Sequence, residues 1–194
     1  MVTSRKTAKT STARTAPAKA AAKSSRAAAA SGPDAIALLK ADHKRVSDLY
    51  AQYEKTRLVG KKRSLVASIC QELSVHAQVE EEIFYPAVKA ALKDKELVPE
   101  AQVEHATLKE LIAQVQDKEP DGELFDAKIK VMSEYTKHHV KEEQSEMFPK
   151  ARKTRLDMNA LGEQIAARKK ELMASPELLE DPPTPASPAM APAA

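Results

Sequence analysis

The chain of 194 residues is 42% hydrophobic, with four glycines and no tryptophan, a composition that suits one helical domain with tails and argues against a β-sandwich. Its one cysteine, Cys70, excludes an intrachain disulfide framework and a cysteine-rich zinc or iron-sulfur site, which favours a reducing, cytoplasmic location. No apolar run approaches the roughly 18 residues of a membrane span, so no membrane association is expected, and the basic N-terminus lacks the apolar segment of a secretory signal.

Residues 1–32 are predicted to form a disordered, basic tail rich in alanine and lysine, because they offer few apolar side chains to bury. The first 30 positions carry seven basic side chains and no acid, which leaves 24 basic against 28 acidic residues in the rest of the chain. The tail is a solvated extension, an organellar transit peptide, or a segment that binds nucleic-acid phosphates without sequence preference. The candidate phosphate-binding residues are Arg5, Lys6, Lys9, Arg14, Lys19, Lys23 and Arg26.

The first two predicted helices precede Pro86. Pro33 and Asp34 open the first helix, in which apolar residues recur at helical spacing, and Gly60 ends it at the latest. The second helix keeps a seven-residue apolar pattern up to Pro86, where the missing amide donor should kink or end it.

Two further predicted helices complete a domain that we place at residues 33–150. Pro99 suits the first turn of the third helix, which ends in a loop at residues 117–122. The fourth runs from about Leu124 to Pro149. Four helices with short connections predict an all-α, up-and-down antiparallel four-helix bundle.

An additional C-terminal helix is predicted within residues 151–174, where Leu161, Ile165 and Leu172 alternate with basic side chains. We expect this amphipathic helix to pack outside the bundle. Residues 175–194 are rich in proline and alanine, and this composition predicts a second disordered tail.

A His-x3-Glu pattern occurs in two of the predicted helices, as His76 with Glu80 and as His139 with Glu143. Residues four apart lie one turn above each other on a helix, so each pair directs an imidazole and a carboxylate at one point. His138 with Glu142 has the same spacing, but only His139 and Glu143 stand as far from the following proline as the first pair does. The repeat therefore favours His139 and Glu143.

A second repeat precedes each pair. Asp42-His43 and Glu104-His105 are both followed by an apolar residue and a leucine at matching positions. His43 and His105 are 62 residues apart, and His76 and His139 are 63 apart. The chain between about residues 34 and 150 is therefore one two-helix unit used twice.

These side chains occupy positions where a bundle helix requires apolar residues, and buried carboxylates are costly unless a cation compensates them. Any one histidine could make an ordinary core or surface hydrogen bond, but four histidines in phase by chance are improbable. Nitrogen and oxygen ligands without thiolate favour iron, with manganese and zinc less favoured. We expect His43 and His76 near one ion, His105 and His139 near another, and Glu80 and Glu143 bridging them.

The acid-His pairs, the His-x3-Glu-Glu pattern and the terminal aromatic-Pro resemble the hemerythrin-like HHE cation-binding domain over about residues 34–150. The resemblance implies an up-and-down four-helix bundle that holds two non-haem iron ions in an oxo- or hydroxo-bridged centre able to bind dioxygen. Ferritin-like bundles differ because they use Glu-x-x-His.

Three features depart from oxygen-carrying hemerythrins. Those proteins place two histidines four apart on the third helix, whereas His105 has Ala101 before it and Lys109 after it. Their last carboxylate is an aspartate five residues after the histidine, where this chain has Gln144, with Glu143 before it. The third departure is the presence of a predicted disordered tail at each end of the bundle. These departures disfavour simple reversible oxygen carriage and favour peroxide, nitric oxide or iron chemistry.

Glu72 and Tyr135 stand one turn before His76 and His139, so either could orient a ligand or replace the missing one, although structural packing is the simpler interpretation for both. The acidic residues around the pairs are a solvated face or include one supporting group.

The leading hypothesis is a diiron protein that binds, senses or turns over O2, H2O2 or NO, or handles iron, with catalysis left open. The alternatives are a non-catalytic, metal-stabilised bundle tethered to nucleic acid by its tail, and a metal-free scaffold.

Overall fold

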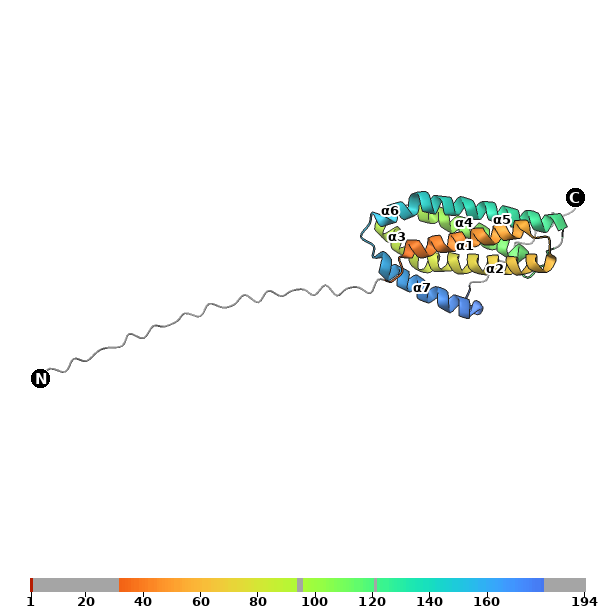
Figure 1. Ribbon diagram of the computed structural model, residues 1–194. Coiled ribbons are helices and arrows are strands. Elements are labelled where there is room, and N and C mark those ends of the chain that lie inside the picture. The colour runs from red at the N-terminus through yellow and green to blue at the C-terminus, as the bar shows by residue number, and fades with distance from the viewer. Residues whose placement is uncertain (2–31, 94–95, 121, 180–194) are drawn as a thin grey trace. The chain divides into compact units, whose positions relative to one another are not determined.

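The computed structural model describes residue 1 and residues 32–93, 96–120 and 122–179, and all regular structure within these ranges is helical (Figure 1). The all-α prediction is confirmed. The basic residues named above and residues 180–194 lie outside the described ranges, whereas Pro176–Leu178, placed in the disordered tail by the sequence, form a short 3-10 helix. The elements are α1 (Ala35–Lys55), α2 (Val59–Val79), η1 (Glu80–Phe84), α3 (Tyr85–Leu92), α4 (Leu97–Val115), α5 (Gly122–Glu142), η2 (Glu143–Met147), α6 (Phe148–Arg152), α7 (Met158–Ala174) and η3 (Pro176–Leu178).

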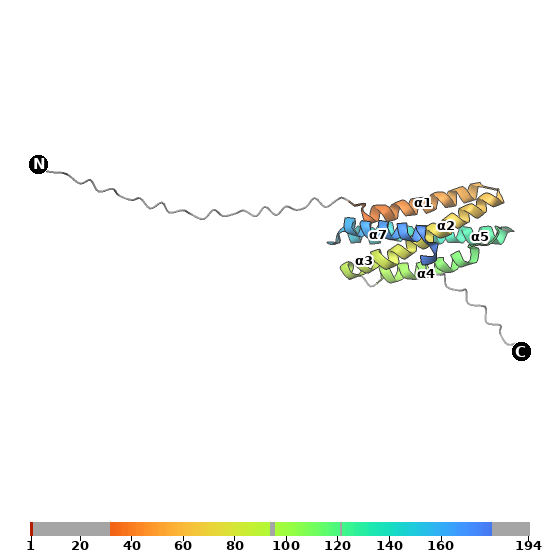
Figure 2. The same cartoon turned by 90° about the horizontal axis from the view of Figure 1, so that it is seen from below.

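The long helices α1, α2, α4 and α5 lie alongside one another (Figures 1 and 2), with α1 packed on α2 and α5, and α4 packed on α5 and α2. Tyr53 near the end of α1 and Lys62 near the start of α2 both donate to Asp126 at the start of α5, each at 2.6 Å. The end of α1 and the starts of α2 and α5 therefore lie at the same end of the bundle. None of the helices in the described ranges is long and apolar enough to cross a membrane.

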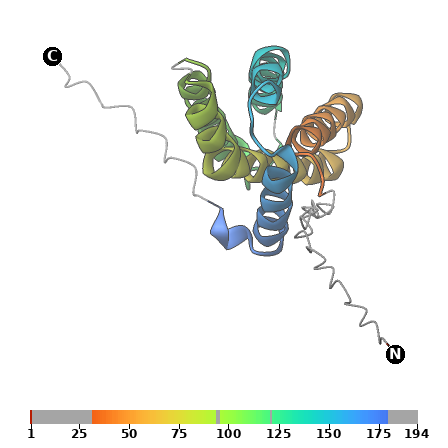
Figure 3. The same ribbon diagram turned by 90° about the vertical axis from the view of Figure 1, so that its left-hand side faces the viewer.

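Helix α7 packs outside these four, against α1 and α2 (Figure 3). It approaches the start of α1 closely, since a Cβ atom on Gly162 would lie 1.6 Å from the carbonyl oxygen of Pro33. Asp34 caps α1 by accepting from the amide of Ala37 at 3.0 Å, and Arg152 of α6 donates to the same carboxylate at 3.0 and 2.8 Å. The first and last parts of the helical domain are thus tied together.

The sequence predicts a kink or an end at Pro86, but the helical run continues to Leu92, after one π-helical turn. The Tyr85 amide donates to the carbonyl of Glu80, five residues earlier, whereas an α-helical amide donates to the carbonyl four residues earlier. This wider turn starts a new α-helical segment in which Pro86 lies in the first turn, where a missing amide donor is tolerated. The fourth predicted helix does the same at Pro149 and continues to Arg152.

Two apolar clusters fill the space between the helices. The first includes Leu39, Val79, Ala101 and Met147, and the second includes Val46, Leu73, Leu108 and Met132. On each long helix a candidate ligand lies between a member of one cluster and a member of the other. The polar side chains are therefore enclosed by apolar packing on both sides along the bundle axis.

Candidate metal centre

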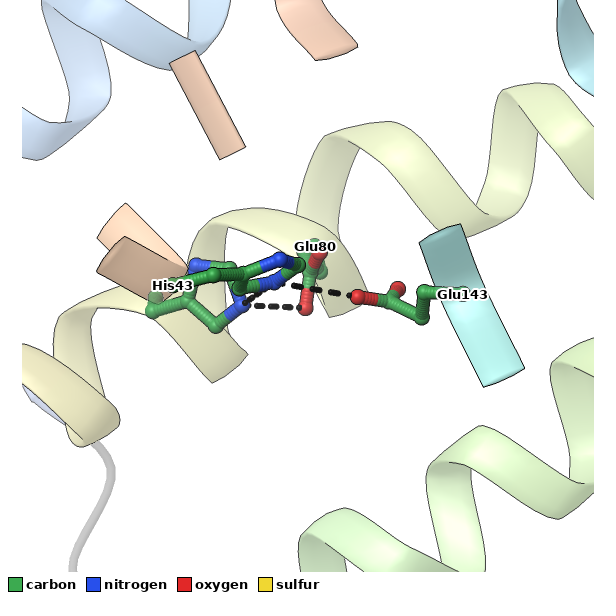
Figure 4. A group of neighbouring side chains, drawn as sticks. His43, Glu80 and Glu143 are labelled. Carbon is green, nitrogen blue, oxygen red and sulfur yellow. Dashed lines mark hydrogen bonds and ion pairs between the residues drawn. The ribbon is translucent and has the colours of Figure 1, made fainter. Parts of the chain in front are cut away.

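Four imidazoles and two carboxylates meet inside the bundle. His43 comes from α1, His105 from α4, and the His-x3-Glu pairs from α2–η1 and α5–η2. All six side chains are buried, and Glu80 is 0% exposed. Figure 4 shows His43, Glu80 and Glu143 pointing toward one another from separate helices. Their ligand-type atoms form two overlapping groups: His43, His76, Glu80 and Glu143, and Glu80, His105 and His139.

The distances divide the site into two halves. In one half, His43 Nε2 lies 3.1 Å from His76 Nε2 and 3.2 Å from Glu143 Oε2. In the other, His105 Nε2 lies 3.2 Å from His139 Nε2. The next contacts join the halves: Glu80 Oε2 is 3.1 Å from His76 Nε2 and 3.5 Å from His105 Nε2. Glu143 Oε2 likewise lies 3.5 Å from His139 Nε2, so each carboxylate reaches both halves.

Each imidazole turns its Nε2 atom inward and its Nδ1 atom toward a polar side chain. The Nδ1 partners and distances are Gln144 at 3.0 Å for His43, Asp42 at 3.5 Å for His76, Glu81 at 2.9 Å for His105, and Glu104 at 2.7 Å for His139. A carboxylate on Nδ1 fixes the ring orientation and leaves the Nε2 lone pair for a metal. The Gln144 amide can present either its oxygen or its nitrogen to His43.

The two repeats differ beside the centre. Tyr85 follows Glu80 by five residues, and its hydroxyl lies 3.2 Å from Glu80 Oε2, 3.2 Å from His105 Nε2 and 3.1 Å from Glu143 Oε1. The equivalent residue of the second repeat is Phe148, which stacks on the His43 ring with a centroid distance of 5.8 Å. The half around His105 therefore has a hydroxyl group that the half around His43 lacks.

Burial, together with the Glu143 charge, raises the pKa of Glu80 to about 7. Burial also opposes ionisation of Glu143, but the close approach of the His43 ring and the charges of the neighbouring imidazoles outweigh it and hold that pKa at about 2. Burial lowers the pKa of His105 to about 4, which keeps this imidazole neutral. The centre therefore does not carry enough positive charge of its own to ionise both carboxylates fully near neutral pH.

Hydrogen bonds within the protein also leave these carboxylates incompletely satisfied. Oxygen Oε1 of Glu80 and Oε2 of Glu143 are buried without a hydrogen-bond donor among the described residues. Although burial opposes it, the charge of Glu80 and the bond to Asp42 raise the pKa of His76 to about 10, so without a cation the carboxylates depend on protonated imidazoles for their counter-charge. A metal cation between them removes both problems, so the donor set fits a nitrogen- and oxygen-ligated metal.

A family model described as Hemerythrin HHE cation binding domain matches residues 34–151. The chain belongs to this family. The crystal structure of a hemerythrin HHE cation binding domain-containing protein from Mycobacterium kansasii is similar to this HHE protein, with a TM-score of 0.63 and 21% identity, over 74% of this chain and 89% of that one. At this identity the likeness shows the fold.

A curated relative, a protein named DNA nickase from Nostoc sp. (strain PCC 7120 / SAG 25.82 / UTEX 2576), is 24% identical over 111 residues of this HHE protein. The match covers 57% of this chain and 31% of the relative. The chain therefore spans about a third of the length of that relative.

The structure brings together the six candidate ligands, but Glu72 and Tyr135, the two candidate supporting residues, do not contact them. Glu72 forms an ion pair with Arg45, and Tyr135 is 46% exposed on α5. The groups that do contact the imidazoles are Asp42, Glu81, Glu104, Gln144 and Tyr85. The sequence contained a signal for four of them, because each stands directly beside a candidate ligand.

A cavity of about 170 Å³ between α1 and α5 reaches His43 at the edge of the centre. His43, Thr136, Val140 and Gln144 line it, with Lys137 and Lys141 among its other lining residues. Thr136 and Val140 also line the small space around the imidazoles. A diatomic molecule or a peroxide could approach His43 by this route.

Proposed function

We propose that this HHE protein holds two iron ions in an up-and-down four-helix bundle and binds, senses or turns over a small oxidant such as O2, H2O2 or NO, or handles iron. The observation that carries the proposal is the cluster of four inward Nε2 atoms around two buried carboxylates. One oxygen of each carboxylate is buried without a hydrogen-bond donor among the described residues, and membership of a cation-binding family supports the same conclusion.

In this proposal His43 and His76 hold one ion, His105 and His139 hold the other, and the carboxylates of Glu80 and Glu143 bridge them. Manganese and zinc also accept nitrogen and oxygen ligands, but two bridging carboxylates with imidazoles suit iron. Bound iron would supply the electrons that a small oxidant takes up.

The chain's own residues would control the approach and protonation of the oxidant. The cavity between α1 and α5 admits small molecules beside His43. The Tyr85 hydroxyl, with a pKa raised by burial and by Glu80 and Glu143, keeps its proton at the centre. Tyr85 can therefore donate a hydrogen bond to a molecule held between the two halves.

Metal analysis with an optical spectrum tests the proposal. Protein from iron-supplied cells should carry about two irons per chain and show ligand-to-metal bands that change with peroxide or nitric oxide. Protein that takes up no iron, from cells or by reconstitution, would rule the proposal out. If the protein binds metal but its absorption bands do not change with any oxidant, the metal only stabilises the bundle.

A second candidate function is attachment to nucleic acid through the basic tail. Seven basic side chains and no acid within the first 30 residues support it, and the relative named DNA nickase is consistent with it. Deleting residues 1–30 should leave metal binding intact and abolish salt-dependent retention on DNA. If the full chain shows no such retention, the tail is only a solvated extension.

A further inference from the structure

A second group of histidine and carboxylate side chains lies on α4 and α5, outside the centre. His138 Nε2 is 3.4 Å from Glu104 Oε1 and 3.3 Å from Glu142 Oε1. The side chain of His138 is 62% exposed, whereas Glu104 reaches inward and its other oxygen contacts His139 Nδ1 at 2.7 Å. One carboxylate therefore joins this surface group to the candidate metal centre.

The first repeat has no such group at the equivalent positions. Val75 and Val79 stand where the second repeat has His138 and Glu142, and both are 0% exposed within the first apolar cluster. Ile165 and Leu172 of α7 belong to the same cluster. The side of the bundle that α7 covers is thus apolar, while the matching positions on the other side carry a histidine and a glutamate.

Two other carboxylates that contact an imidazole Nδ1 atom have a partner for their second oxygen as well. Asp42 contacts His76 with one oxygen and the ammonium group of Lys169 with the other. Glu81 contacts His105 with one oxygen and Lys109 with the other, at 2.8 Å. In both cases a positive charge meets the second oxygen.

Glu104 differs from both, because its second oxygen faces His138, beside the further negative charge of Glu142. A bound cation would place there the positive charge that a lysine places at the equivalent oxygens of Asp42 and Glu81. The ligand atoms of the three side chains already lie within 4.8 Å of one another.

We propose that Glu104, His138 and Glu142 form an outer site for a divalent first-row transition cation. One imidazole and two carboxylates match the ligands that such ions accept, and solvent can fill the remaining positions. Because Glu104 also orients His139, an ion in the outer site changes the charge on the group that holds a candidate ligand of the centre. The outer site is thereby coupled to the centre, although its existence does not depend on iron.

Equilibrium dialysis of the full chain against Zn²⁺, after its tight metal has been counted, tests the outer site. The wild type should bind one further ion, with an affinity at least about tenfold lower in His138→Ala and in Glu142→Gln. Glu146→Gln is the matched control, since Glu146 is an exposed carboxylate paired with Lys150 at 3.5 Å, and it should bind as the wild type does. No further ion in the wild type, or equal binding by all variants, would overturn the outer site.

The optical bands of the iron-loaded protein test the coupling. Zn²⁺ should shift them in the wild type and leave them unchanged in His138→Ala. Zinc bound without any shift would overturn the coupling through Glu104. Iron content measured on the same samples separates this result from the proposed function, because His138→Ala leaves the six inner residues intact.

Discussion

Neighbouring residues along this chain act on different helices. Asp42 and Glu104 each precede a candidate ligand histidine and hold the imidazole of the following helix, while Glu81 and Gln144 each follow a candidate bridging carboxylate and hold an imidazole of the other repeat. Every ring is therefore held from outside the centre. Such orientation reduces the conformational entropy that metal binding would otherwise remove.

The internal repeat provides a matched test of this orientation at Glu81. Because glutamine performs the same task at the equivalent Gln144, Glu81→Gln should weaken metal binding only slightly. Glu81→Ala removes the contact to His105 and should weaken binding about 10- to 100-fold. Competition with a chelator measures both. Equal affinities for the alanine variant and the wild type would show that Glu81 does not position His105.

Substitutions on α5 test which histidine belongs to the centre. His139→Ala or Glu143→Ala should remove most of the tightly bound metal, because each deletes a buried ligand-type group. His138→Ala should keep it, since His138 faces outward. Iron per chain after gel filtration distinguishes these outcomes. Retention of iron by the His139 variant and its loss from the His138 variant would reverse the assignment.

His139, which the repeat favours, is buried, whereas His138 is exposed, and Tyr135, one turn before His139, is exposed as well. In a bundle the buried seam follows alternating steps of three and four residues. On α5 this seam passes through Met132, Thr136 and His139, all buried, so Thr136 takes the inward position and Tyr135 lies outside. The spacing alone could not choose between steps of three and four.

At the scale of the helices, the two π-helical turns start at Glu80 and Glu143 and determine what stands beside the centre. In an α-helix, a residue five positions on is rotated about 140° away from the first. The wider turn brings Tyr85 back over Glu80 and Phe148 back over His43. Sequence periodicity assumes a constant turn, and the proline that follows suggests a break, so the contact of Tyr85 with the carboxylates could not be predicted.

Two glycines test how α7 docks on the bundle. Gly162→Ala should destabilise the protein by roughly 1–3 kcal/mol or more, because the new methyl group meets the backbone at Pro33. Gly60→Ala is the control, since a Cβ atom there has nothing within 4 Å and alanine favours the helix by roughly 0.5–1 kcal/mol. Urea unfolding measures both. A Gly162 variant as stable as the wild type would mean that α7 can shift away from Pro33 without loss.

At the scale of the whole molecule, the all-helical class, the long helices and the burial of the six candidate ligands could be predicted for the described residues, because one pattern occurs twice. The polar layer lies between two apolar clusters, and α1, α2 and α4 each contribute to all three layers, as α5 does together with η2 and α6. Sequence could not show which face α7 covers, since its apolar positions fit either side of a four-helix bundle. Because α7 covers the side that contains Asp42, its Lys169 donates to that carboxylate, while Glu104 on the other side pairs with the exposed His138.

The layered arrangement predicts that metal removal weakens the whole fold. Stripped protein retains two buried carboxylates without a full set of donors in the middle of the bundle. Metal at about 100 times its dissociation constant adds about 2.7 kcal/mol of stability. For a domain of this size, that corresponds to a rise in Tm of roughly 5–10 °C. Calorimetry of stripped, reloaded and His139→Ala protein measures the change, and the variant should resemble the stripped form whether or not metal is added. Identical melting of stripped and loaded wild type would show that the six side chains do not depend on a cation for their burial.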